Sequence, residues 1–149
     1  MLFIKSFFHA FRGFFDAVKT ERNLRFHLVA AFYVLFISPF FLQSKTDWTV
    51  VILLICTVIS LELINTAIEK LCDLITTDYN VNIKFIKDVA SGAVLITAIG
   101  AVVIACLLFL RYEGFILLFD FSKQNLWYPI LLIISAPISF LFIKGKKGN

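Results

Sequence analysis

The sequence is poor in charged residues and in the residues that mark fibrous, disordered or disulfide-rich chains. Asp, Glu, Lys and Arg make up 16% of its 149 residues, against roughly 25% in soluble proteins. Six glycines and three prolines exclude a collagenous or low-complexity chain. Three cysteines with no CxxC spacing exclude a disulfide scaffold. The basic residues lie between apolar stretches and form no stripe, so no nucleic-acid partner is expected.

Apolar side chains are abundant instead. Hydrophobic residues account for 60% of the chain, and 18 residues are Phe. Soluble proteins reach about 45–50% by a slightly broader count. An ordinary water-soluble core is therefore excluded, and the composition predicts a small, all-α integral membrane protein.

Four stretches approach the roughly 20 apolar residues that a membrane-spanning helix needs. The predicted spans cover residues 26–42, 48–75, 84–110 and 127–143. The last is short and contains two prolines and two serines, so entering and leaving on one side is the alternative to spanning; we expect it to span.

A different kind of helix is predicted over residues 3–25. Phenylalanines recur there at helical spacing, and charged residues occupy the rest of the turn. This pattern is typical of an amphipathic helix lying in the membrane interface. Packing against the protein's own spans is a compatible interpretation.

The distribution of positive charge predicts the orientation. If all four spans cross the membrane, 11 of the 14 Lys and Arg residues fall on the side of the N-terminus. That side is predicted to be cytoplasmic, because Lys and Arg are enriched in cytoplasmic segments. It includes the tail residues Lys144, Lys146 and Lys147.

Polar residues gather on one face of the second span. At about 100° per residue, Glu62, Asn65, Glu69 and Asp73 lie within about 80° of one another on the helix. Carboxylates in a membrane helix cost about 2.5–3.5 kcal/mol each at the centre, so they are functional candidates by default. This stripe predicts a polar site near one membrane surface.

Two more polar clusters are predicted at the same surface. Lys84, Lys87, Asp88 and Ser91 begin the third span, and residues 21–25 precede the first. Carboxylates suit a hard cation such as Mg²⁺, and lysines suit phosphates. Glu62 lies deepest and could take a proton from a lipid hydroxyl. Taken singly, Asn65 and Ser91 are more typical of helix–helix hydrogen bonds, Glu21 and Arg25 of a surface ion pair, and the lysines of interfacial anchors. Glu62 and Glu69 together favour a functional site.

Four motifs resemble the small integral-membrane lipid kinases of bacteria, the diacylglycerol kinase/undecaprenol kinase family. The resemblance spans residues 3–110, and we take residues 1–110 as the kinase domain. The motifs are FxxAxxG from Phe7, ERNLRFH over 21–27, ExxNTAIExxxD over 62–73 and KxxKDxxSGAVL over 84–95. Residues 111–149 extend beyond the usual end of the family and contain the predicted fourth span.

The resemblance implies a homotrimer in the bacterial cytoplasmic membrane, with active sites at subunit boundaries on the cytoplasmic side. It implies that Glu62 is the catalytic base and that Glu21 and Glu69 hold Mg²⁺ against the phosphates of ATP. Further matches are to nucleotide contacts at Tyr79, Lys87 and Asp88, and to positions near the lipid substrate at Arg25, Asn65 and Ser91.

The lipid substrate is predicted from a departure within the family. Position 27 is His where the enterobacterial branch has a carboxylate, and position 80 is Asn where that branch has His. The ERNxRxH form resembles the branch that includes undecaprenol kinases, so undecaprenol is favoured and diacylglycerol is the alternative. A hypothesis from another class is a non-catalytic membrane subunit or a small ion or proton transporter, whose acidic stripe would be the ion path.

Overall fold

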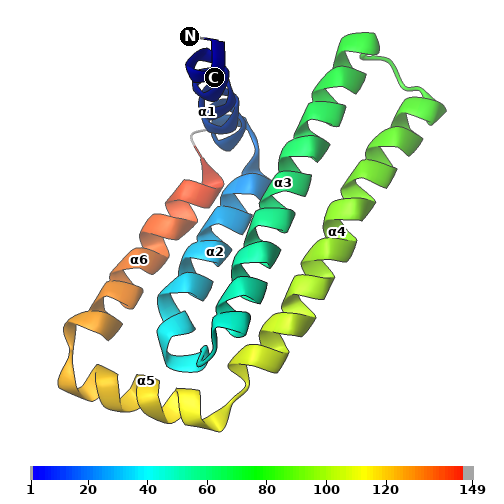
Figure 1. Ribbon diagram of the computed structural model, residues 1–149. Coiled ribbons are helices and arrows are strands. Elements are labelled where there is room, and N and C mark those ends of the chain that lie inside the picture. The colour runs from blue at the N-terminus through cyan, green and yellow to red at the C-terminus, as the bar shows by residue number, and fades with distance from the viewer. Residues whose placement is uncertain (1, 146–149) are drawn as a thin grey trace.

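The computed structural model describes residues 2–145, which are almost entirely helical (Figure 1). No strand occurs within this range, as the composition predicts. Six helices follow one another: α1 (Leu2–Thr20), α2 (Arg22–Phe41), α3 (Lys45–Ile75), α4 (Val81–Phe109), α5 (Tyr112–Gln124) and α6 (Trp127–Lys144).

Four of these helices are long and apolar enough to cross a membrane, namely α2, α3, α4 and α6. They correspond to the four predicted spans, with ends that differ by at most four residues. Pro137 lies inside α6 without ending it. The prediction of an all-α membrane protein is confirmed.

The predicted surface helix is shorter than expected. α1 ends at Thr20, and α2 begins at Arg22. Between them Glu21 has φ −98° and ψ 116°, an extended conformation that interrupts the helix. The first span therefore begins four residues before its predicted start. We call residues 18–25 the α1–α2 elbow.

One face of α1 is covered with exposed aromatic rings. Its charged side chains pair with one another on another part of the surface, where Arg12 and Lys19 lie 3.8 and 3.2 Å from the carboxylate of Asp16. The exposed rings belong to Phe3, Phe7, Phe8, Phe11 and Phe15. This distribution matches the predicted amphipathic helix.

α3 and α4 each begin three residues before the predicted start of the span, after a polar residue that caps the helix. Ser44 Oγ accepts a hydrogen bond from the backbone N–H of Asp47 at 3.0 Å. Asn80 Oδ1 accepts bonds from the N–H groups of Asn82 and Ile83 at 2.9 and 3.2 Å. These contacts satisfy first-turn N–H groups that have no partner within the helix.

Helix α5 was not predicted. It lies across the end of the bundle and connects α4 to α6 (Figure 1). Its Gly114 faces the ring of Phe41, and a Cβ at this position would come within 2.3 Å of that ring. Arg111 Nη1 also lies 3.3 Å from Asp47 Oδ2 at the start of α3. These contacts fix α5 against the ends of α2 and α3.

Helix α6 returns along α2 toward α1 (Figure 1). The Tyr128 ring stacks on Phe36 with centroids 4.5 Å apart, and its hydroxyl donates to the Phe36 carbonyl at 2.8 Å. Farther along, the Tyr33 hydroxyl lies 2.9 Å from Ser135 Oγ and 3.1 Å from Ser139 Oγ. The expected fourth span thus packs on the first.

α1, the α3–α4 connection and the end of α6 all lie at the same end of the bundle (Figure 1). This is the arrangement that the distribution of Lys and Arg predicts when all four segments cross. Lys146 and Lys147, which were counted on that side, lie outside the described residues.

Most large apolar side chains remain exposed. Only 6% of the most apolar stretch of α4 is buried within the chain. In water such a surface would be unstable. Lipid is the environment that could cover it, in keeping with the predicted membrane location.

Candidate active site

The polar stripe on α3 runs from a buried end to an exposed end. Glu62 and Asn65 are 3% and 7% exposed, Glu69 is partly exposed, and Asp73 is open to the surroundings. Because α3 is one uninterrupted helix, these side chains share a face, as the periodicity predicts. Charge on this face therefore extends from the bundle surface into its interior.

Glu62 has a half-buried histidine as its neighbour. His27 Nε2 lies 3.1 Å from Glu62 Oε1, and the side chains are 19% and 4% exposed. A buried carboxylate without a partner is costly, so this contact explains how Glu62 is accommodated. His27 lies on α2, two residues beyond the elbow, and thus connects α2 to the deepest carboxylate of α3.

The middle of the stripe links α3 to α4. The side-chain amide of Asn65 donates to Glu69 Oε1 at 2.9 Å and fixes that carboxylate. Ser91 Oγ on α4 donates to Asn65 Oδ1 at 3.4 Å. The structure therefore brings together three residues that the sequence assigned to two separate helices.

A second link lies nearer the surface. Lys87 Nζ on α4 is 2.6 Å from Asp73 Oδ1 on α3. Asp88, in contrast, pairs with Lys84 of its own helix at 2.6 Å, and both side chains are exposed. Tyr79 lies in the α3–α4 connection and is 80% exposed. Lys87 thus joins the stripe directly, whereas Asp88 and Tyr79 lie on open surface beside it.

The elbow brings the remaining predicted residues to this end of the bundle. Glu21 Oε1 lies 3.7 Å from Lys70 Nζ on α3. Arg25 is only 7% exposed, and its guanidinium donates to the carbonyls of Val18 and Lys19, each at 2.9 Å. Arg25 was predicted to lie near the lipid substrate; in this structure it binds backbone carbonyls.

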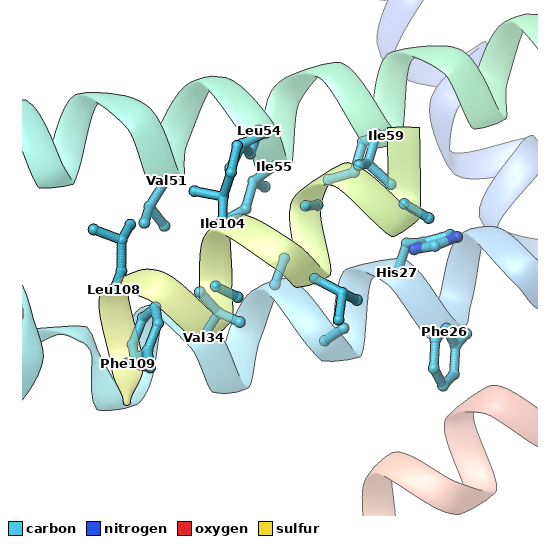
Figure 2. Close-up of a pocket in the computed structure, with 17 residues that line it drawn as sticks. Phe26, His27, Val34, Val51, Leu54, Ile55, Ile59, Ile104, Leu108 and Phe109 are labelled. Carbon is cyan, nitrogen blue, oxygen red and sulfur yellow. The ribbon is translucent and has the colours of Figure 1, made fainter. Parts of the chain in front are cut away.

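An apolar cavity of about 310 Å³ lies between α2, α3 and α4. Figure 2 shows its lining residues, with His27 toward one end and Phe109 toward the other. Five alanines widen it, and His27 is the single polar residue in its lining. Because His27 also contacts Glu62, the cavity ends where the polar stripe begins.

The residues fit a cation that is shared with phosphates better than a closed metal site. No cluster of three or more His, Cys, Asp or Glu side chains suited to a metal ion occurs among residues 2–145. Glu21 and Glu69 each offer a carboxylate at this end of the bundle, beside Lys70 and Asn65 respectively. Carboxylate oxygens are the ligands that Mg²⁺ prefers, and Mg²⁺ is often held by one or two of them together with substrate phosphates.

Sequence reasoning missed two features of the site. His27 was interpreted as a marker of lipid preference, without a contact to Glu62. The cavity depends on how three helices pack, which periodicity along one helix does not reveal. The sequence feature that could have indicated a role for His27 in the site is its position in the ERNLRFH motif, at the start of an apolar span.

Comparison with known proteins identifies the family. The sequence model of the prokaryotic diacylglycerol kinase family matches residues 8–109, which include the whole polar stripe and both lysines of α4. The chain belongs to this family. Undecaprenol kinase of Bacillus subtilis (strain 168) is 44% identical over 108 residues, covering 72% of this chain and 88% of that protein.

A second relative extends the comparison within the prokaryotic diacylglycerol kinase family. Diacylglycerol kinase of Synechocystis sp. (strain ATCC 27184 / PCC 6803 / Kazusa) is 38% identical over 105 residues, covering 69% of this chain and 60% of that protein. No solved structure gives a significant match. Membership of the family makes the chain a lipid kinase, with a membrane lipid as acceptor and ATP as the implied co-substrate. α5 and α6 lie beyond the matched residues.

Proposed function

We propose that this lipid kinase transfers the γ-phosphoryl group of ATP to the terminal hydroxyl of undecaprenol, with Mg²⁺ bound at Glu21 and Glu69. The observation that carries this proposal is the contact of the buried Glu62 with the half-buried His27, which lies between the apolar cavity and the polar stripe. A lipid alcohol and a nucleotide can meet only where an apolar and a polar compartment adjoin. Glu62 occupies that boundary.

Glu62 is the proposed general base. Its carboxylate accepts the proton of the lipid hydroxyl as the hydroxyl oxygen attacks the γ-phosphorus. The bond from that phosphorus to the bridging oxygen breaks, and ADP leaves. His27, with Nε2 protonated, donates to Glu62 Oε1 and holds the carboxylate in one orientation.

The nucleotide is proposed to bind across the exposed half of the stripe. Lys87 offers positive charge to the phosphates, and Asp88 and Tyr79 flank it on the accessible surface. Mg²⁺, when bound, neutralises charge on the phosphates. Asn65 fixes Glu69 through the 2.9 Å hydrogen bond, and Asp73 holds the lysine at 2.6 Å until phosphate competes for it.

Orientation and assembly complete the proposal. The end of the bundle that carries α1 and the polar stripe faces the cytoplasm, because it has the excess of Lys and Arg. ATP then approaches from that side and the lipid from the bilayer of the bacterial inner membrane. A homotrimer would cover part of the exposed α4 surface.

Diacylglycerol is the second candidate acceptor, because the Synechocystis relative bears that name. The higher identity and greater coverage of the undecaprenol kinase support undecaprenol.

The test is a phosphotransfer assay with the purified chain in mixed detergent–lipid micelles. Labelled ATP and Mg²⁺ are supplied with undecaprenol or with diacylglycerol in parallel. We expect label to enter undecaprenol with the higher kcat/KM. Preferential labelling of diacylglycerol would refute the assigned acceptor, and no labelling of either lipid by folded, ATP-binding protein would refute the proposed reaction.

A further inference from the structure

Arg25 joins three segments of the chain. Its Nη1 donates to the carbonyls of Val18 and Lys19 at 2.9 Å each, and its Nε donates to the carbonyl of Ile143 at 3.2 Å. The first two carbonyls lie in the last turn of α1, and the third lies in the last turn of α6. One buried guanidinium therefore connects the C-terminal ends of two helices to the start of α2.

Helix ends of this polarity attract positive charge. The last carbonyls of a helix have no partner within it, and the helix dipole places partial negative charge there. Two such ends converge on Arg25, which is 7% exposed. Hydrogen bonds to a charged donor are stronger than neutral ones, so this junction favours one arrangement of α1, α2 and α6.

Gly145 closes the junction on the side of α6. It has φ +66°, a conformation that side chains disfavour, and a Cβ there would lie 2.8 Å from Arg25 Nη2. α6 is also held along α2 by the contacts of Tyr33 and Tyr128. The end of α6 is thus held on the elbow by the hydrogen bond from Arg25 and by the close packing of Gly145 against the guanidinium. The tyrosine contacts hold the rest of α6 along α2.

The elbow contains one residue of the proposed site, and another follows it on α2. Glu21, the predicted Mg²⁺ ligand, lies one turn before Arg25, and its carbonyl accepts the backbone N–H of Arg25 at 3.3 Å. His27, which contacts Glu62, lies two residues after it. A shift at Arg25 would therefore move Glu21, whose backbone it contacts directly, whereas His27 is also held by its contact with Glu62.

We propose that the C-terminal extension is a positioning element of the kinase site: through Ile143 and Gly145, α6 fixes Arg25 and so holds Glu21 where MgATP binds. This inference rests on the proposed function. It assigns a role to a segment beyond the residues that the family model matches. Arg25 acts here as a positioning residue, through Glu21.

The test compares full-length variants in the micelle assay. Gly145→Ala adds a Cβ against Arg25 without altering any residue of the site. Tyr33→Phe removes the hydroxyl contacts to the serines of α6 and serves as a second, milder variant. Ile133→Ala is the matched control, because Ile133 lies on α6 and is 72% exposed.

We expect Gly145→Ala to raise the KM for MgATP about fivefold or more, the lower end of usual coupling between sites. Tyr33→Phe should raise it in the same direction by less. The KM for the lipid should stay unchanged in both variants, and the control should match the wild type. A loss of kcat alone, or equal rises in both KM values, would indicate a merely structural role and overturn the proposal.

Limited trypsin digestion separates this proposal from the proposed function. Cleavage after Lys19 and Arg22 reports on the elbow, and cleavage after Lys123 in α5 serves as the internal reference. Gly145→Ala should accelerate the elbow cleavages relative to the reference. If the wild type transfers no phosphate, the proposed function fails while digestion still tests whether α6 fixes the elbow; unchanged elbow cleavage overturns the inference in either case.

Discussion

Replacing His27 tests the electrostatic arrangement around Glu62. The Glu62 side chain is 4% exposed, and His27 Nε2 lies 3.1 Å from its Oε1. His27→Leu places an apolar side chain of similar size at the cavity and removes the imidazole N–H that faces Glu62. The carboxylate would then lose the partner that orients it and offsets its burial.

The magnitude follows from the cost of removing one partner of a hydrogen bond to a charged group. Such losses amount to about 1.5–3 kcal/mol. If the full cost appears in the transition state, kcat falls roughly 10- to 160-fold, since each 1.36 kcal/mol is a factor of ten. The KM for MgATP should change little, because His27 lies on the lipid side of the site.

His27→Gln is the matched control, because its side-chain amide can still donate to Glu62. We expect this variant to retain most of the wild-type kcat. Both variants are assayed in lipid micelles at saturating MgATP, and folding is checked by thermal unfolding. A Leu variant within twofold of wild type, or a Gln variant as impaired as Leu, would refute the argument.

Three further predictions follow from the structure. Glu69→Gln should lower activity at least about tenfold, and excess Mg²⁺ in a titration should restore it only in part; unchanged turnover would contradict the metal assignment. Ala101→Phe, which fills the cavity, should lower kcat/KM for the lipid at least about tenfold, whereas Ile96→Phe on the exposed face of α4 should not. Gly114→Ala should destabilise the fold by about 1–3 kcal/mol, seen as a lower Tm, because its Cβ would overlap Phe41; an unchanged Tm would contradict this packing.

The sequence predicted those features that depend on one helix at a time. The stripe that contains Glu62 and Glu69 follows from helical periodicity, and the four spans follow from the length of apolar runs. Helix ends were less accurate because local capping decides them: Ser44 and Asn80 extend α3 and α4 toward their N-termini. The extended backbone at Glu21, which divides α1 from α2, has no comparable sequence signal.

Features that depend on two or more helices could not be predicted from the residues alone. The His27–Glu62 contact requires a particular rotation of α2 against α3. The hydrogen bond from Arg25 to α6 could not be predicted, because the sequence does not show that α6 ends beside the elbow. α5 is only 13 residues long, too short to span, so its apolar pattern was not distinguished from a connecting segment.

The most direct test of the central claim, that Glu62 is the base at the meeting point of lipid and nucleotide, is label transfer from ATP to undecaprenol by Glu62→Gln. Glu113→Gln is the matched control, since Glu113 lies in α5 at the opposite end of the bundle. We expect Glu62→Gln to bind ATP and transfer no measurable label, and Glu113→Gln to match the wild type. Transfer by Glu62→Gln at the wild-type rate would contradict the account.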